Sequence, residues 1–363
     1  MALEKLSPTT LSFYAPRFEV QINSSRLAAN ISKAIIDVTI DEKMDEGASF
    51  RLTVNDEFDM TKQQFKWLDH PLFDVGNTIS IRIGYGSDLQ EIMTGEITSL
   101  EPSFFSGELP TIAISGQDLS YDHLKRTAPE RTFTDRSYSD IARAVASEAG
   151  LQAVVDDTVI FEPFIRKNNN ETYYAFLESL AAKAGYTFSI DRRTMYFIRP
   201  PDDRKEILSL ALGKDIISFR PRMNTTDLVT EVEVRGHDPR NPNTPIIGRA
   251  RAGTERSQEP GRRTGSRVAA DRHGEIKSVL TGMIVNSVEH ANAIAQAELN
   301  RRSDTFVEGA VESIGIPQIR PGVTIKLEKV GQKFSGKYYV KETSHSIGNS
   351  GYRLRFTVKR NAI

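Results

Sequence analysis

Histidine is the side chain that most often combines metal binding with proton transfer, and this chain has six, widely separated. Zinc hydrolases hold their metal through close pairs such as His-Glu-x-x-His, and neither that pattern nor His-x-His occurs. His345, in Ser344-His345-Ser346 beside an alternating segment, is the strongest single candidate for catalysis. A surface or hydrogen-bonded structural histidine is nevertheless the better interpretation. The six are His70, His123, His237, His273, His290 and His345.

Paired carboxylates are the second class of residue that could do chemistry. A glycosidase needs two carboxyls facing each other across a cleft, and the sequence does not exclude such a pair. Each cluster here stands at the end of a predicted strand or helix, where solvated acids are usual, so we expect none of them to be catalytic. The clusters are Asp56, Glu57 and Asp59; Asp156 and Asp157; and Asp202 and Asp203.

Glycine-rich segments that could bind phosphate or present a nucleophile also lack the necessary spacing. Gly84-Tyr85-Gly86 has no third glycine and leads into turn residues, not a helix. Gly261-Arg262-Arg263-Thr264-Gly265-Ser266 lacks the lysine and spacing of a P-loop, and Gly348-Asn349-Ser350-Gly351 reads as a hairpin turn. The sequence therefore predicts no catalytic residue, no cofactor site and no metal site.

The composition excludes further classes. The chain has no cysteine, which removes disulfides, thiolate metal sites and cysteine nucleophiles, and is compatible with a reducing compartment. Forty-seven basic against 48 acidic residues give a net charge of −1, which argues against coating nucleic acid or an anionic membrane. The arginine-rich segment 236–275 is better interpreted as a solvated or partner-ordered loop than as a polyanion site.

No segment resembles a secretory signal or a membrane span. Residues 1–8 contain no apolar region. The longest apolar runs, such as 173–177, are about five residues, whereas a bilayer needs roughly 20. A length of 363 residues is enough for two or three domains, so we expect a soluble, multidomain protein without membrane insertion or specific nucleic-acid binding.

The first part of the chain, residues 1–125, alternates apolar and polar residues in short segments separated by turn residues. This pattern predicts half-buried antiparallel strands and favours a β-barrel domain. The segments are 18–22, 35–40, 50–54, 79–83 and 92–97.

Residues 126–201 predict a small α+β domain. The segment 137–150 begins with Ser137 as a capping residue and stops at Gly150, which predicts a helix. A second helix is predicted over 170–185, followed by a hairpin whose strands are 186–190 and 195–198.

Residues 202–363 predict a second β-barrel domain. A strand is predicted over 228–234, a helix over 287–302, and three strands at the end of the chain. Between them, residues 236–275 hold clustered Gly, Pro, Asn, Ser and Arg, which predicts a long loop or a disordered excursion.

The closing strands resemble earlier ones, which predicts that the two barrels are related. Residues 322–327 align with 76–81, residues 336–340 with 95–99, and residues 351–358 with 107–114. In each copy the strands open with a glycine and end in an alternating segment. The predicted fold class is mainly β, with two related antiparallel barrels and an α+β insertion.

The segment 170–188 followed by Met195-Tyr196-Phe197 resembles a signature of contractile-tail hub proteins. Residues 334–340, Ser344-His345 and 351–361 are similar to the C-terminal strands of the same family. This is the phage late control protein D group, with the hub part of VgrG and its relatives in extracellular contractile injection systems. The similarity covers roughly residues 15–361 outside the 236–275 segment.

The resemblance implies a non-enzymatic, homotrimeric baseplate hub, assembled in the bacterial cytoplasm and part of a virion tail or an injection particle. Three chains with two similar barrels each would present six barrels to a hexameric tail tube and a three-fold face to a central spike. Neighbours would close the exposed barrel edges, the α+β unit would lie outside, and the helix 287–302 would belong to the second barrel. Because the chain ends at Ile363, after the hub pattern, the spike is expected to be a separate protein. Other baseplate components are further expected partners.

Two alternatives remain open. A receptor-binding or adhesive β-module would show exposed aromatic patches, and the single tryptophan, Trp67, is as easily a core residue. A carbohydrate-active enzyme would show a cleft with two facing carboxyls of raised pKa.

Overall fold

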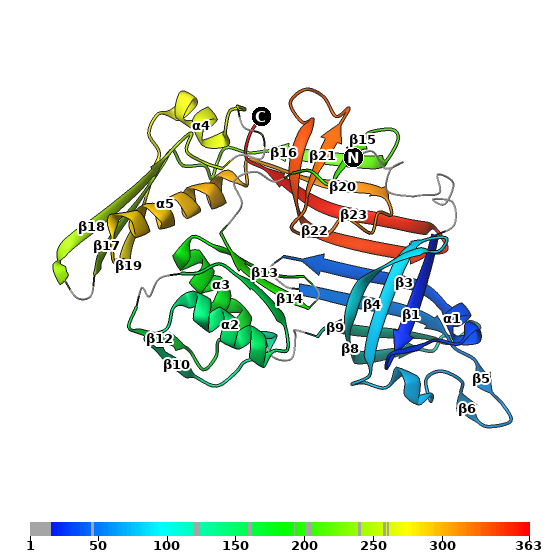
Figure 1. Cartoon of the computed structure of the whole chain (residues 1–363). Helices are drawn as coiled ribbons and strands as arrows, with labels where there is room; N and C mark the ends of the chain where they lie inside the picture. The colour runs from blue at the N-terminus through cyan, green and yellow to red at the C-terminus, as the bar shows by residue number, and fades with distance from the viewer. Residues whose placement is uncertain are drawn as a thin grey trace.

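The computed structural model describes residues 16–44, 47–119, 124–158, 162–191, 193–199, 205–238, 241–256, 259 and 261–363. Residues 1–15, His123, Asp202 and Asp203 lie outside this range. Figure 1 shows a large sheet on the right, a green α+β unit at the lower left, and a unit of yellow to gold strands and helices at the upper left. None of the helices in these ranges is long and apolar enough to cross a membrane.

The large sheet is antiparallel apart from one strand pair, and its central path runs β16-β20-β23-β22-β3-β4-β9-β8-β7-β1-β2. Strands β21 and β15 extend from β22 beside this path. Its strands are β1 (Pro16–Ile22), β2 (Ser25–Arg26), β3 (Ile35–Lys43), β4 (Gly47–Asn55), β7 (Thr78–Tyr85), β8 (Asp88–Ser103), β9 (Thr111–Asp118), β15 (Leu208–Ala211), β16 (Ile216–Met223), β20 (Val307–Ile314), β21 (Thr324–Glu328), β22 (Gly336–Gly348) and β23 (Gly351–Arg360). Helix α1 (Ala29–Ala34), the 3-10 helix Pro71–Phe73 and the small hairpin of β5 (Phe58–Asp59) and β6 (Gln64–Phe65) accompany the first half.

The two halves of this sheet repeat one strand order. The first half runs β1-β7-β8-β9-β4-β3 and the second runs β15-β21-β22-β23-β20-β16. Each half buries its own hydrophobic cluster. One pairing differs, because β15 lies parallel to β21 whereas β1 is antiparallel to β7. The predicted fold, mainly β with two related halves and an α+β insertion, is therefore confirmed.

The repeat extends to single hydrogen bonds. The Gly76 N–H donates to the Ile97 carbonyl at 2.9 Å, and the Gly322 N–H donates to the Val340 carbonyl at 3.0 Å. Matching β-bulges follow in the same places, between Ile97 and Ser99 in β8 and after Val340 in β22.

These contacts correct two of the three sequence alignments. The match of 322–327 with 76–81 agrees with the hydrogen bonds, but Val340 is equivalent to Ile97 and not to Ser99. The matches of 336–340 and 351–358 are thus displaced by two residues. A shift of two keeps every side chain on the same face of a strand, so an alternating pattern does not detect it.

The two halves meet where β22 pairs antiparallel with β3, from Glu342–Lys43 to Gly348–Asp37. We call this pairing the seam. It makes one sheet out of two, and Figure 1 shows the orange-red strands passing into the blue ones across it.

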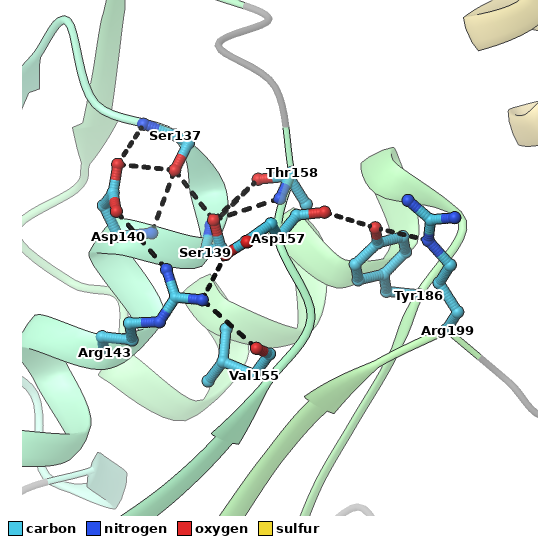
Figure 2. A network of polar contacts seen from close by, with 9 residues as sticks. All are labelled: Ser137, Ser139, Asp140, Arg143, Val155, Asp157, Thr158, Tyr186 and Arg199. Atoms are coloured by element: carbon cyan, nitrogen blue, oxygen red, sulfur yellow. Dashed lines mark hydrogen bonds and ion pairs between the residues drawn. The ribbon is translucent and has the colours of Figure 1, made fainter.

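The middle α+β unit has its own core, built by α2 (Tyr138–Glu148) and α3 (Tyr173–Ala184). Ser137 caps α2 as predicted, because its hydroxyl accepts from the Asp140 N–H at 3.1 Å while the Asp140 carboxylate accepts from Ser137 (Figure 2). Helix α3 begins at Tyr173, three residues later than expected. The strands are β10 (Arg131–Thr134), β11 (Gln152–Val155), β12 (Phe164–Lys167), β13 (Thr187–Asp191) and β14 (Thr194–Ile198).

The segment 236–275 is not a long loop, and that prediction was wrong. It contains the end of β17 (Glu231–Asp238), all of β18 (Asn241–Arg251) and α4 (Gly265–His273). Strand β17 lies between β18 and β19 (Lys277–Ile284), and α5 (Val288–Ser303) packs on β17 and β18. We call this three-stranded sheet with α5 the wing. The predicted helix 287–302 exists, but its apolar side chains belong to the wing cluster and not to the second barrel.

The close approach of α5 explains why β18 looked like a loop. A Cβ on Gly248 would meet the Ala291 carbonyl carbon at 2.2 Å and the Asn292 nitrogen at 2.4 Å. The buried positions of β18 are therefore Gly248 and Ala250, so the strand has no run of large apolar residues to reveal it.

We expect Gly248→Ala to loosen the wing, because the added methyl group must push α5 away from β18. Overpacking of this kind costs about 1–3 kcal/mol, which corresponds to about a fivefold or larger loss of hydrogen-exchange protection in α5. Thr244→Ala, at an exposed position of the same strand, is the matched control. Equal protection in both variants would contradict the packing described.

Candidate functional site

The seam holds a buried polar cluster. Glu42 follows Val38 and Ile40 on the inward face of β3, and its carboxylate is ion-paired with Arg320. The Arg320 guanidinium also donates to the Ile92 carbonyl at 3.2 Å, and the Thr343 hydroxyl donates to Glu42 at 3.4 Å. The cluster thus joins the first barrel to the loop before β21 and to β22 of the second.

His345 is fully buried in the same cluster. Its Nδ1 lies 2.7 Å from the Tyr352 hydroxyl oxygen, and its Nε2 lies 3.9 Å from the Glu42 carboxylate. Burial, reinforced by the positive charge of Arg320, lowers the pKa of His345 to about 3, although a hydrogen bond to the Ile319 backbone opposes the shift. The imidazole is therefore neutral at physiological pH. The interpretation as a hydrogen-bonded structural histidine fits this environment.

Tyrosines complete the cluster on the side of β7. The Tyr85 hydroxyl donates to the Gly315 carbonyl at 2.9 Å, and the Tyr85 and Tyr352 ring centroids are 5.7 Å apart. A Cβ on Gly315 would lie 2.0 Å from the Tyr352 ring, so only glycine fits there. Burial raises the pKa of Tyr352 well above its ordinary value. These groups fix the two halves together and expose no reactive atom.

The other described histidines lie far apart in the fold. His70 Nδ1 accepts from the Leu72 N–H at 3.2 Å in a turn, and His237 and His273 are exposed. His290 is buried between α5 and α3, with Nε2 3.3 Å from the Lys183 carbonyl oxygen, and burial lowers its pKa. Within the described ranges no three His, Cys, Asp or Glu side chains are grouped so that they could hold a metal ion.

The described carboxylate clusters have structural partners. Asp56 is buried, not solvated as expected, and accepts from the backbone N–H groups of Glu57, Trp67 and Leu68 at 2.8–3.0 Å. It thereby orders the turn that places Trp67 in the first core. Asp59 accepts from two backbone N–H groups of its own turn.

The pair Asp156 and Asp157 ties the α+β unit together, as Figure 2 shows in part. Asp157 is ion-paired with Arg143 of α2, and its carbonyl accepts from the Tyr186 hydroxyl at 2.8 Å. The Asp156 carboxylate accepts from the Arg199 N–H at 2.9 Å. Among the described residues, the contacts given for both acids lie within the α+β unit.

A groove of about 640 Å³ crosses the seam on the outward face of the large sheet. Charges of both signs line it, and Glu312 lies 3.9 Å from the Arg355 guanidinium. The charged lining residues are Asp41, Lys43, Arg220, Glu312, Glu342 and Arg355. The groove therefore brings together charged side chains of both halves across the seam.

The open face of the wing carries a second charged cluster. Glu233 is buried under Lys277, Arg249 and Arg235, whose nitrogens lie 2.6–2.7 Å from its carboxylate. These hydrogen bonds, led by that of Lys277, lower the pKa of Glu233 to about 2. A carboxylate held ionised in this way cannot serve as a general acid at neutral pH.

Sequence reasoning missed the ion pair of Glu42 with Arg320. One signal was available, since Glu42 continues the inward alternation of Val38 and Ile40 and so places an acid on an apolar face. Nothing in the sequence marks Arg320 as its partner.

Residues 14–349 match the family model described as the Alg8 N-terminal domain. The chain belongs to that family. No curated protein matches it in sequence.

Its fold is shared with tail and secretion proteins. A 43 kDa tail protein of prophage MuSo2 from Shewanella oneidensis is 17% identical, with a TM-score of 0.70 over 95% of this chain and 98% of that one. A tail protein from Neisseria meningitidis MC58 is 12% identical, with a TM-score of 0.68 over 96% and 97%. An Escherichia coli type VI secretion component, described as similar to T4 tail proteins gp27 and gp5, is 10% identical, with a TM-score of 0.57 over 90% and 74%.

We expect Arg320→Met to destabilise the first barrel by about 3–5 kcal/mol, because it leaves the Glu42 carboxylate buried without its cation. The double variant Glu42→Gln/Arg320→Met should recover much of this loss. Urea unfolding followed by the fluorescence of Trp67, which is buried in the first core, measures the effect. Arg51→Met, which breaks an exposed ion pair with Glu101, is the control and should cost less than about 1 kcal/mol. A loss in Arg320→Met no larger than in this control would contradict the role of the buried pair.

We expect the seam to weaken as the pH falls from about 6.5 toward about 3, because the unfolded chain takes up a proton on His345 that the folded chain does not. The urea midpoint should therefore fall less between pH 7 and about pH 4.5 in His345→Gln than in the unsubstituted chain. His237→Gln, at an exposed position, should keep the full fall. An equal fall in all three proteins would refute this account.

Proposed function

We propose that this protein is a non-enzymatic structural hub of a contractile tail or contractile injection system. In this proposal three copies form a ring of six related barrels. The ring contacts a six-fold tail tube on one face and a three-fold spike on the other.

The observation that carries the proposal is the repeated strand order within one continuous sheet. A chain with two equivalent barrels presents the same type of surface twice, so a trimer of such chains can match a six-fold partner. The likeness of the fold to phage tail proteins and to a type VI secretion component supports the same setting.

The proposal includes a separate spike protein, a tail tube protein and other baseplate components as partners, with assembly in the bacterial cytoplasm. It also assigns residues 1–125 and 202–363 to the two barrel domains and 126–201 to the α+β domain, with the wing inserted into the second barrel domain. Membership of the late control protein D group, as distinct from the wider set of tail proteins, belongs to this proposal.

One observation favours the receptor-binding alternative. Phe58, Phe104 and Phe105 are 40%, 56% and 67% exposed, and Phe65 links Phe58 to Phe104 through ring contacts of 5.0 and 5.2 Å. An adhesive module would use such a patch on a receptor. A hub would bury it within its own assembly.

The test is the mass of the purified protein in solution, measured by light scattering at several concentrations, alone and with its spike protein co-expressed. We expect three times the 40.6 kDa of one chain, either alone or with the spike bound. A monomer under both conditions would overturn the hub proposal and favour the receptor-binding alternative.

A further inference from the structure

Among the described residues, several strand edges of the large sheet have no partner strand, and two of them correspond to each other through the repeat. Strand β16 pairs with β20 alone, apart from a single bridge from Leu212 to Ile216. The C-terminal part of β8, from Ser99 onward, pairs with β9 alone. Edges of this kind are sites for pairing with another chain.

The repeat identifies what these edges correspond to. Strand β16 is the equivalent of β3, and both have a bulge after their first residue, at Ile216 and Ile35. The C-terminal part of β8 is the equivalent of β22 from Glu342 onward. Within the chain, β3 and this part of β22 pair with each other at the seam.

We propose that the edge of β16 in one copy packs against the C-terminal edge of β8 in the next copy, repeating the seam between chains. This inference rests on the proposed function, which requires three copies in a ring. A contact between two different surfaces joins copies head to tail, and three copies close the ring with the β16 edge and the β8 edge of every copy paired.

The seam fixes the register of this contact. At the seam, His345 of β22 pairs with Ile40 of β3. Pro102 of β8 is the equivalent of His345, and Pro221 of β16 is the equivalent of Ile40, so Pro102 faces Pro221 in the contact between copies. On the inward face, Leu100 then faces Met223 and Phe104 faces Phe219. On the outward face, Glu101 faces Arg222 and Ser103 faces Arg220.

The side chains on these edges fit one another. All six inward positions are apolar, and Leu100, Phe104, Phe219, Pro221 and Met223 are half-buried or exposed in one chain. Contact between copies would remove them from water. On the outward face, the exposed Arg220 and Arg222 meet a partner edge that offers the carboxylate of Glu101.

Facing prolines modify the hydrogen bonding of the contact. At the seam, the Met44 N–H donates to the Lys341 carbonyl at 3.3 Å, so these two residues form a hydrogen-bonded pair. Every second pair along an antiparallel ladder is hydrogen-bonded. Ile40 lies four residues before Met44 and is opposite His345, so His345–Ile40 is also a hydrogen-bonded pair. Pro102 and Pro221 have no N–H, so the equivalent pair between copies forms no such bonds. Side-chain packing therefore carries more of this contact than of the seam.

Introduced cysteines test the contact directly, because the chain has none of its own. The pair Ser103–Arg220 is equivalent to Ser346–Thr39, which is a non-bonded pair next to His345–Ile40. Cα atoms of such pairs lie about 4.5 Å apart, within the range of a disulfide. We expect the double variant Ser103→Cys/Arg220→Cys to form covalent trimers under mild oxidation, seen on a non-reducing gel.

Two cysteine controls frame the result. Ser346→Cys/Thr39→Cys should form a disulfide within each chain and leave the mass of the denatured chain unchanged. Ser99→Cys/Arg220→Cys is out of register by four residues, about 13 Å along a strand, and should give no covalent trimer. Equal cross-linking of the in-register and out-of-register pairs would overturn the proposed register.

A charge variant tests the same contact without cysteines. Arg222→Glu should weaken trimer formation about tenfold or more, because it places a carboxylate opposite Glu101. Adding Glu101→Arg should restore it. Arg166→Glu, on the exposed surface of the α+β unit, should leave it unchanged.

The outcomes separate this inference from the proposed function. Trimers that form in light scattering but neither cross-link nor respond to Arg222→Glu would overturn the interface and leave the hub intact. A chain that remains monomeric with its spike and does not cross-link at the highest concentration would overturn both. Covalent trimers from the in-register pair alone support both.

Discussion

The pairing of β22 with β3 is the constraint on which the rest of the molecule depends. It turns two barrels into one sheet, so their relative orientation is set by ladder hydrogen bonds and not by a linker. Beneath it, Glu42 and Arg320 form an ion pair between residues 278 positions apart in the chain. Because both charges are buried, removal of either one alone would leave the other without its ion-pair partner inside the protein.

The other units are anchored around this sheet. The Tyr174 hydroxyl of α3 donates to the Met44 carbonyl at the end of β3 at 2.5 Å, which ties the α+β unit to the seam. His290 of α5 approaches the Lys183 carbonyl of α3, which ties the wing to the α+β unit. The barrels, the α+β unit and the wing thus form a connected series.

The buried acids and histidines discussed above have partners within the fold. Glu42 is ion-paired with Arg320, and His345 lies against the Tyr352 hydroxyl. The duplicated barrels supply two equivalent surfaces per chain, and the exposed apolar residues near β8 lie on one of the edges that the duplication leaves open. In the proposed ring, the function depends on symmetry and on complementary surfaces, and it requires no catalytic residue.

The sequence by itself determined the features that depend on a local pattern of apolar and polar residues. Helices α2 and α5 follow from a capping serine and an amphipathic pattern, and the likeness of 322–327 to 76–81 follows from alternation after a glycine. The tertiary structure alone decided what depends on distant partners. The wing strand β18 is hidden in the sequence because α5 leaves room only for Gly248 and Ala250, and the correct alignment of β22 with β8 differs by a shift of two that alternation cannot detect. Arg320 is likewise identified as the partner of Glu42 only when β21 and β3 are brought together, because a strand pattern records which face a residue occupies but not what lies opposite it.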